Sequence, residues 1–95
     1  MRWLTASGPR VITAQPVTDR IVPLTFAIPG GSAQLLHWFV APDEPYREGA
    51  VLARVRLTSG AIWDLTARTR GTLERVLVDS GAAVRSAEWL ALARA

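Results

Sequence analysis

The chain from residue 33 to residue 93 carries one sequence pattern twice, and this internal repeat limits the fold more than any other feature. An offset of 38 residues aligns the apolar positions of the two copies: Leu35 with Leu73, Trp38 with Val76, Val40 with Val78, Tyr46 with Val84, and Leu52 with Leu90. Each copy alternates apolar and polar residues on both sides of a turn, which is typical of two adjacent strands. Neither copy can bury its apolar face alone, so the repeat predicts two similar halves that pack face to face.

The remaining segments favour an all-β chain, because no segment keeps a capped period of about 3.6 residues. The expected strands cover residues 21–28, 35–41, 50–57, 61–67, 71–78 and 88–93. Residues 82–93 also contain good helix formers behind Ser80, a residue type that caps helices, but the repeat favours a strand there. The segment Thr58-Ser59-Gly60 is predicted to turn a hairpin that projects between the two copies, with Gly60 at the position that favours a positive φ.

Strand alternation also predicts which side chains face the core. It places Trp38, Trp63 and Trp89 inside, where aromatic side chains bury a large apolar area. The outward positions on the two central strands that are candidates for contact with a partner are Leu52, Arg54, Arg56 and Ile62. We expect the apolar members, Leu52 and Ile62, to be exposed between arginines and to form part of a contact face.

Composition indicates one small folded domain, since 95 residues with 49% hydrophobic and 20% charged residues are ordinary values for such a chain. We expect the domain to span residues 21–95. Residues 1–20 are expected to form either a flexible arm or one or two added strands, and Trp3 in this segment is a candidate anchor for a partner. No apolar run approaches the ~20 residues of a membrane span, and no secretion signal is recognisable, so we expect a cytoplasmic protein.

The basic residues are all arginine, and the sequence has no lysine. Eleven arginines against eight acidic residues give a net charge of +3, and most of the arginines are interleaved with acids. This favours a solvated surface of mixed sign. The arginines that occur in local pairs, and that would form a nucleic-acid-binding patch on adjoining strands, are Arg54, Arg56, Arg68 and Arg70. Nucleic-acid binding is therefore an alternative function, and the less favoured one.

Several ordered positions suggest a known architecture. They are Leu35, Trp38-Phe39-Val40, the run Asp43–Gly49, Leu52-Ala53, Ala67, Gly71-Thr72-Leu73, Val78, Gly81, Val84 and Trp89-Leu90. Together with the repeat, they resemble the biotinyl/lipoyl domain family from about Ile21 to the end of the chain. The resemblance implies a flattened β-barrel, or barrel-sandwich hybrid, of two four-stranded antiparallel sheets related by a pseudo-twofold axis. In that family, the hairpin between the halves carries a lysine to which biotin or lipoate is attached.

This sequence departs from the family at that lysine. Counting forward from Gly49 places the attachment position on Ser59, and counting back from Ala67 and Gly71 places it on Gly60. Biotin and lipoate are joined to a lysine amine, and arginine is delocalised and always protonated, so it cannot replace lysine. A chain without lysine cannot carry either group by this chemistry. We therefore expect no cofactor.

The sequence offers little catalytic machinery. It has no cysteine and a single histidine, His37, which excludes thiolate sites and makes a histidine metal site improbable. His37 next to Phe39 is expected to be a half-buried packing residue, and Ser59 a turn residue. The alternative is a phosphocarrier or enzyme that uses His37, alone or with Ser59 as nucleophile. The carboxylates are dispersed, with no pair spaced for acid–base catalysis.

These observations lead to one expectation of function. We expect a non-catalytic module without a metal or prosthetic group that binds another protein or a second copy of itself. Trp3, Leu52 and Ile62, together with the four paired arginines, are the candidate contact residues.

Overall fold

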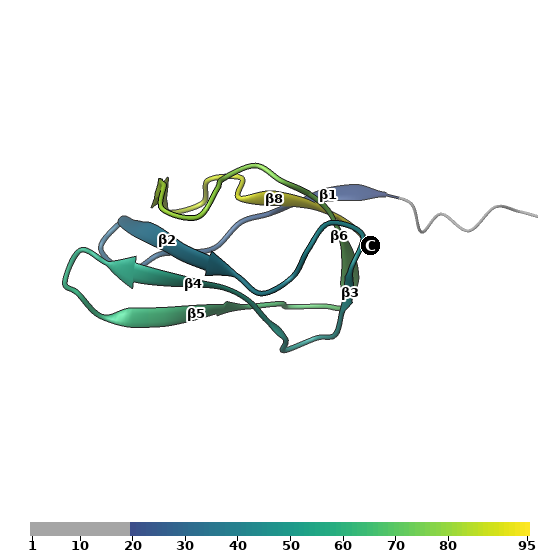
Figure 1. Ribbon diagram of the computed structural model, residues 1–95, viewed down its shortest axis with the longest axis horizontal. Coiled ribbons are helices and arrows are strands. Elements are labelled where there is room, and N and C mark those ends of the chain that lie inside the picture. The colour runs from purple at the N-terminus through teal and green to yellow at the C-terminus, as the bar shows by residue number, and fades with distance from the viewer. Residues whose placement is uncertain (1–19) are drawn as a thin grey trace, which may run out of the picture.

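The computed structural model describes residues 20–95 of the chain, and those residues form eight strands and no helix. The strands are β1 (Ile21–Leu24), β2 (Ser32–Trp38), β3 (Pro45–Tyr46), β4 (Val51–Leu57), β5 (Ile62–Thr66), β6 (Gly71–Val76), β7 (Ala83–Arg85) and β8 (Ala91–Arg94). They build two four-stranded antiparallel sheets, β1-β8-β6-β3 and β5-β4-β2-β7, which face each other as the two layers of Figure 1. The predicted all-β class and the strand at the C-terminal end are confirmed. Neither sheet closes on the other, so the fold is a flattened sandwich.

The two sheets repeat the same strand order. Exchanging β5 for β1, β4 for β8, β2 for β6 and β7 for β3 converts one sheet order into the other. The register repeats as well, because Ala33 pairs with Val84 and, 38 residues away in each strand, Gly71 pairs with Tyr46. A β-bulge interrupts β2 after Leu35, and a second bulge interrupts β6 at the corresponding place. The predicted pseudo-twofold relation between the halves is therefore confirmed in strand order, pairing and irregularity.

Two equivalent turns join the halves. The N–H of Asp43 donates to the carbonyl of Leu73 at 2.7 Å, and the N–H of Gly81 donates to the carbonyl of Leu35 at 2.6 Å. Both turn residues have positive φ, 68° at Asp43 and 94° at Gly81. Each half therefore supplies a turn that hydrogen-bonds to a strand of the other half, which fixes the two sheets relative to each other.

The core lies between the sheets in two adjoining clusters. Leu35 belongs to one cluster and its repeat equivalent Leu73 to the other, and both side chains are fully buried. Phe26 and Trp38 pack against both clusters and so join them. The indole N–H of Trp38 donates to the carbonyl of Val78 at 2.8 Å, which satisfies its polar atom in this position. Burying each large apolar side chain stabilises the fold by about 1.5–3 kcal/mol.

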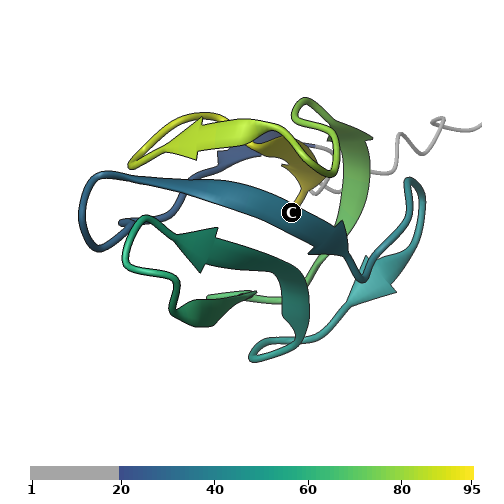
Figure 2. The same cartoon turned by 60° about the vertical axis from the view of Figure 1, so that its left-hand side comes forward.

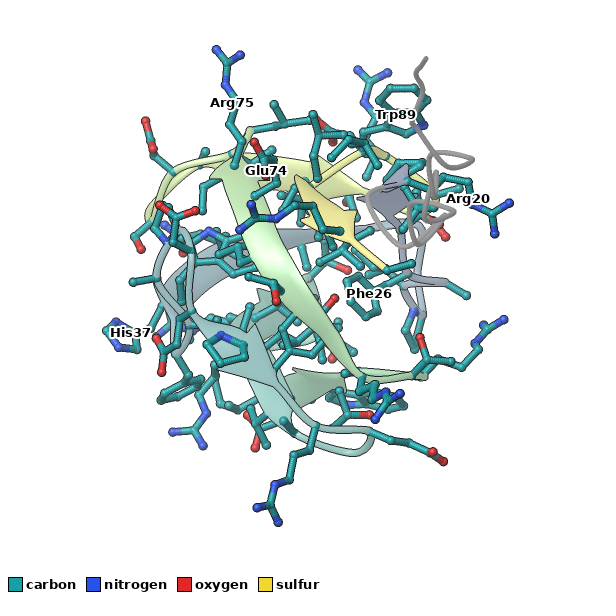
Figure 3. The ribbon with its side chains drawn as sticks, turned by 90° about the vertical axis from the view of Figure 1, so that its right-hand side faces the viewer. Arg20, Phe26, His37, Glu74, Arg75 and Trp89 are labelled. Atoms are coloured by element: carbon teal, nitrogen blue, oxygen red, sulfur yellow. The ribbon has the colours of Figure 1, made fainter. Side chains whose placement is uncertain are left out.

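Three side chains lie on a different side from that predicted. Leu52 is only 1% exposed, because a bulge in β4 between Val51 and Ala53 shifts the alternation and turns Leu52 inward beside Ala53. Trp63 is 48% exposed because β5 is an edge strand with a neighbour on one side only. Trp89 is 58% exposed because it belongs to the turn before β8 and points away from the body of the sandwich in Figure 3.

The positions of the hairpin and of the chain entry follow from this arrangement. The β4–β5 hairpin extends from the end of the sandwich that lies farthest from the C terminus (Figures 1 and 2). Its turn has Gly60 at a φ of 91°, as predicted. The arm or added strand predicted over residues 1–20, with Trp3, lies outside the described residues except for Arg20. Within residues 20–95, no helix is long and apolar enough to cross a membrane.

Candidate interaction surface

An open groove separates the outer strands of the two sheets. It has a volume of about 450 Å³ and is bounded by residues 22–27, which comprise most of β1 and the segment after it, and by residues 63–70 of β5 and the segment after it. Because β1 and β5 are edge strands of different sheets, no strand among residues 20–95 closes this flank. We call this feature the edge groove. Its walls include the apolar residues Leu24, Leu52 and Leu65 from both layers, so the groove reaches the core.

Arginines line one part of the edge groove. Arg68 and Arg70 follow β5 directly, are exposed, and make no ion pair within residues 20–95. Arg94 on β8 also lines the groove, but its guanidinium binds Asp43 at 3.0 Å and Glu74 at 3.1 Å. The positive charge that remains available in the groove therefore belongs to Arg68 and Arg70.

Arg54 lies elsewhere and is already paired. It binds Asp64 through two hydrogen bonds, Nε to Oδ1 at 2.7 Å and Nη2 to Oδ2 at 3.2 Å. These bonds lower the pKa of the Asp64 carboxyl and raise the pKa of the Arg54 guanidinium. The guanidinium also lies over the ring of Phe39, 5.2 Å from its centroid. Arg54 and Arg56 thus lie on β4, and the predicted four-arginine set is divided between this strand and the edge groove.

His37 and Ser59 do not come together. His37 is exposed, points away from the body of the sandwich in Figure 3, and meets Phe39 edge to face at 4.8 Å between ring centroids. It pairs with Arg54, whereas the residue before the hairpin turn, Leu57, pairs with Ala33 at the opposite end of β2. The Ser59 hydroxyl accepts a hydrogen bond from the N–H of Ala61 at 3.3 Å, as a turn residue does. Within the described residues, no base lies beside this hydroxyl.

The hairpin turn does not fit a biotin or lipoate group. The residues at its tip are Thr58, Ser59 and Gly60, and none of them carries an amine. The sequence provides no lysine anywhere from which an amide to either group can form. No step of a carrier reaction is therefore assigned to this chain.

A second hollow of about 490 Å³ adjoins the edge groove and shares Tyr46, Arg70 and Arg94 with it. Burial raises the pKa of the Tyr46 phenol. Sequence reasoning missed Tyr46, Arg94 and the edge groove itself. The groove is built from segments far apart in the chain, and only the positions of β1 and β5 at the two sheet edges bring them together.

Comparison with solved structures finds a similar fold within a larger protein. Part of a single-chain, multi-domain long-chain acyl-CoA carboxylase superposes with a TM-score of 0.65 and 22% sequence identity over 92% of this chain. This chain spans 8% of the carboxylase. No protein-family model matches the chain, and no curated protein matches it. The fold is thus shared with part of a carboxylase, in agreement with the biotinyl-like architecture that the sequence predicts.

Proposed function

We propose that this chain is a biotinyl-like module without a prosthetic group, and that it acts as a non-catalytic protein-interaction or assembly domain. The observation that supports this most strongly is the hairpin tip, which offers a serine and a glycine where an attachment amine would stand. The exposed and separate positions of His37 and Ser59 support a role without catalysis. The open flank between β1 and β5 gives such a module a surface for a partner.

The similarity to part of an acyl-CoA carboxylase suggests the kind of assembly to search first. A domain with this fold occupies a small share of that multi-domain chain. We infer that this chain takes the place of such a domain beside a larger partner, as a scaffold. Fold similarity alone is a limited basis for function, so the partner has to be found directly.

The test is affinity purification of the tagged chain from its native host, with cross-linking and quantitative mass spectrometry. The proposal predicts one protein at near-stoichiometric amount, cross-linked to residues 20–95. Sedimentation of the purified chain alone distinguishes a partner from self-association. A chain that purifies alone and sediments as a monomer at high concentration contradicts the proposal, as does an enzymatic activity that His37→Gln abolishes.

Nucleic-acid binding is the second candidate, supported by the unpaired guanidiniums of Arg68 and Arg70. It is less favoured, because Arg54 and Arg94 have carboxylate partners and the available arginines form no continuous stripe. A titration with duplex and single-stranded oligonucleotides at two salt concentrations decides it. Phosphate contacts must weaken steeply as salt rises.

A further inference from the structure

We propose that the edge groove receives an extended acidic segment of a partner protein, which pairs with the free edge of β5. This inference rests on the proposed interaction role and specifies its site and the chemistry of the partner. The argument combines three observations: an unpaired strand edge, an apolar wall beside it, and two arginines without partners at its end.

The backbone of β5 is free on the groove side. The N–H of Leu57 donates to the carbonyl of Ala61 at 2.8 Å, which sets the alternation of hydrogen bonds along the hairpin. The residues that direct their N–H and C=O groups away from β4 are therefore Ile62, Asp64 and Thr66. No strand among residues 20–95 bonds to this edge. It is a template for one further strand, and main-chain hydrogen bonds supply affinity in this mode of recognition.

The facing edge of β1 is less suited to pairing. The N–H of Ala95 donates to the carbonyl of Arg20 at 3.1 Å, so Val22 and Leu24 bond to β8 and the alternate residue Pro23 faces outward. Proline has no N–H to donate to an incoming strand. β1 therefore forms a wall of the edge groove, while β5 provides the hydrogen-bonding edge.

The groove selects side chains as well as backbone. On the inner side of β5, Trp63 and Leu65 line the groove together with Leu24 and Phe26 from the opposite wall. Alternate residues of an added strand point to this side, so apolar residues in the partner would cover the exposed ring of Trp63. Phe26, labelled in Figure 3, lies between the two layers.

Charge identifies the partner as acidic. Arg68 and Arg70 lie where a strand added to β5 would continue, and neither has an ion pair within residues 20–95. The nearest carboxylate on β5, Asp64, is already bound by Arg54. Residues 1–19 contain two arginines and one aspartate, so this part of the chain does not have the complementary charge. Carboxylates on a partner segment complement the two arginines and orient the segment in the groove.

The probe is a fluorescein-labelled peptide, Glu-Val-Thr-Val-Thr-Val-Glu, titrated with the full chain by fluorescence anisotropy. The matched control peptide has lysine in place of both glutamates. The charge variant is Arg68→Glu with Arg70→Glu. Its control is Arg47→Glu with Arg75→Glu, which changes the net charge equally at exposed arginines that do not line the groove. Ile62→Pro removes one outward N–H from the β5 edge. Thermal unfolding confirms that each variant is folded.

We expect the acidic peptide to bind the wild-type chain and the lysine peptide to bind at least ten times more weakly. The charge variant weakens binding of the acidic peptide at least tenfold, equivalent to about 1.4 kcal/mol, while its control stays within about twofold. Ile62→Pro also weakens binding, because it removes a main-chain donor.

Equal binding by all variants, or equal binding of the two peptides, overturns the inference. Binding of a duplex oligonucleotide in place of the acidic peptide also overturns it, in favour of nucleic acid. Sedimentation that shows edge-to-edge dimers which the peptide cannot dissociate overturns it in favour of a second copy. If the charge variant still purifies with the wild-type partner, the groove proposal fails while the interaction role stands. If the wild-type chain has no partner, the interaction role itself fails.

Discussion

The phenol of Tyr46 on β3 occupies the space above Gly71 on β6, its partner in the sheet. A β-carbon on Gly71 would lie 2.6 Å from the phenol oxygen and 2.9 Å from Cζ of Tyr46. In the other half of the repeat, the corresponding pair is Ala33 and Val84. The larger side chain of one pair is therefore accommodated by the absence of a side chain on the opposite residue.

This relationship predicts coupled mutations. Gly71→Ala forces the added methyl group against Tyr46 and should destabilise the fold by about 1–3 kcal/mol. Tyr46→Val restores the residue type of the other half, so the double variant should be more stable than the sum of the single effects by at least about 0.5 kcal/mol. Urea unfolding of the four proteins measures the coupling. Additive effects would mean that the two residues do not share this space.

A second prediction concerns equivalent turn residues with different amino acids. Gly49 has a φ of 84°, and Ala87, which is 38 residues later, has a φ of 65°. A β-carbon is strained in this left-handed region. We therefore expect Ala87→Gly to stabilise the fold by up to about 1 kcal/mol and Gly49→Ala to destabilise it by about 1–2 kcal/mol. Thermal and urea unfolding measure both, and changes of the same sign would contradict the assigned backbone.

A third prediction separates the two apolar residues that were expected to share an exposed face. Leu52 is buried, so Leu52→Ala should cost about 2–5 kcal/mol of stability. Ile62 is 50% exposed on an edge strand, so Ile62→Ala should change stability by less than about 1 kcal/mol. Equal effects in denaturant unfolding would show that the bulge in β4 is misplaced.

A fourth prediction follows from the ion pair of Arg54 with Asp64. The hydrogen bonds from Arg54 hold the pKa of Asp64 below its ordinary value of 3.8 in the folded chain. The stabilisation is therefore complete above the pKa of the unfolded chain and is lost as pH falls through the lower folded value. Asp64→Asn should reduce stability near pH 7, and the difference from wild type should shrink on acidification.

The measurement is urea unfolding of wild type and Asp64→Asn at several pH values in low salt. Glu48→Gln is the matched control, since it removes the same charge at an exposed residue without an ion pair in residues 20–95. A difference between wild type and Asp64→Asn that does not change with pH would contradict the assigned pair.

The repeat made most of the architecture predictable. An offset read from apolar residues such as Leu35 and Leu73 also relates the sheet orders, the bulges and the cross-linking turns. Strict alternation failed where the backbone is irregular or a strand has one neighbour. The bulge in β4 reversed Leu52, and the sheet edge exposed Trp63. The repeat contained a usable signal at Ala87, which aligns with Gly49, but strand parity alone ignores turn conformation.

The candidate site was less predictable than the fold. The exposure of Ile62 and the turn role of Ser59 follow from local sequence, and both are observed. The edge groove depends on the packing of segments 22–27 and 63–70, and on which arginines find carboxylates. Arg68 and Arg54 look alike in the sequence, yet only Arg54 lies opposite an aspartate in the sheet.

The central claim is that a carrier-like hairpin carries no prosthetic arm in this protein. Trypsin cleaves after Arg56 and Arg68, so one peptide, residues 57–68, contains the whole hairpin turn. The most direct test is the mass of this peptide from protein isolated from its native host. The account predicts the mass of the unmodified sequence. A stoichiometric added mass on the peptide, located at Ser59, would contradict it.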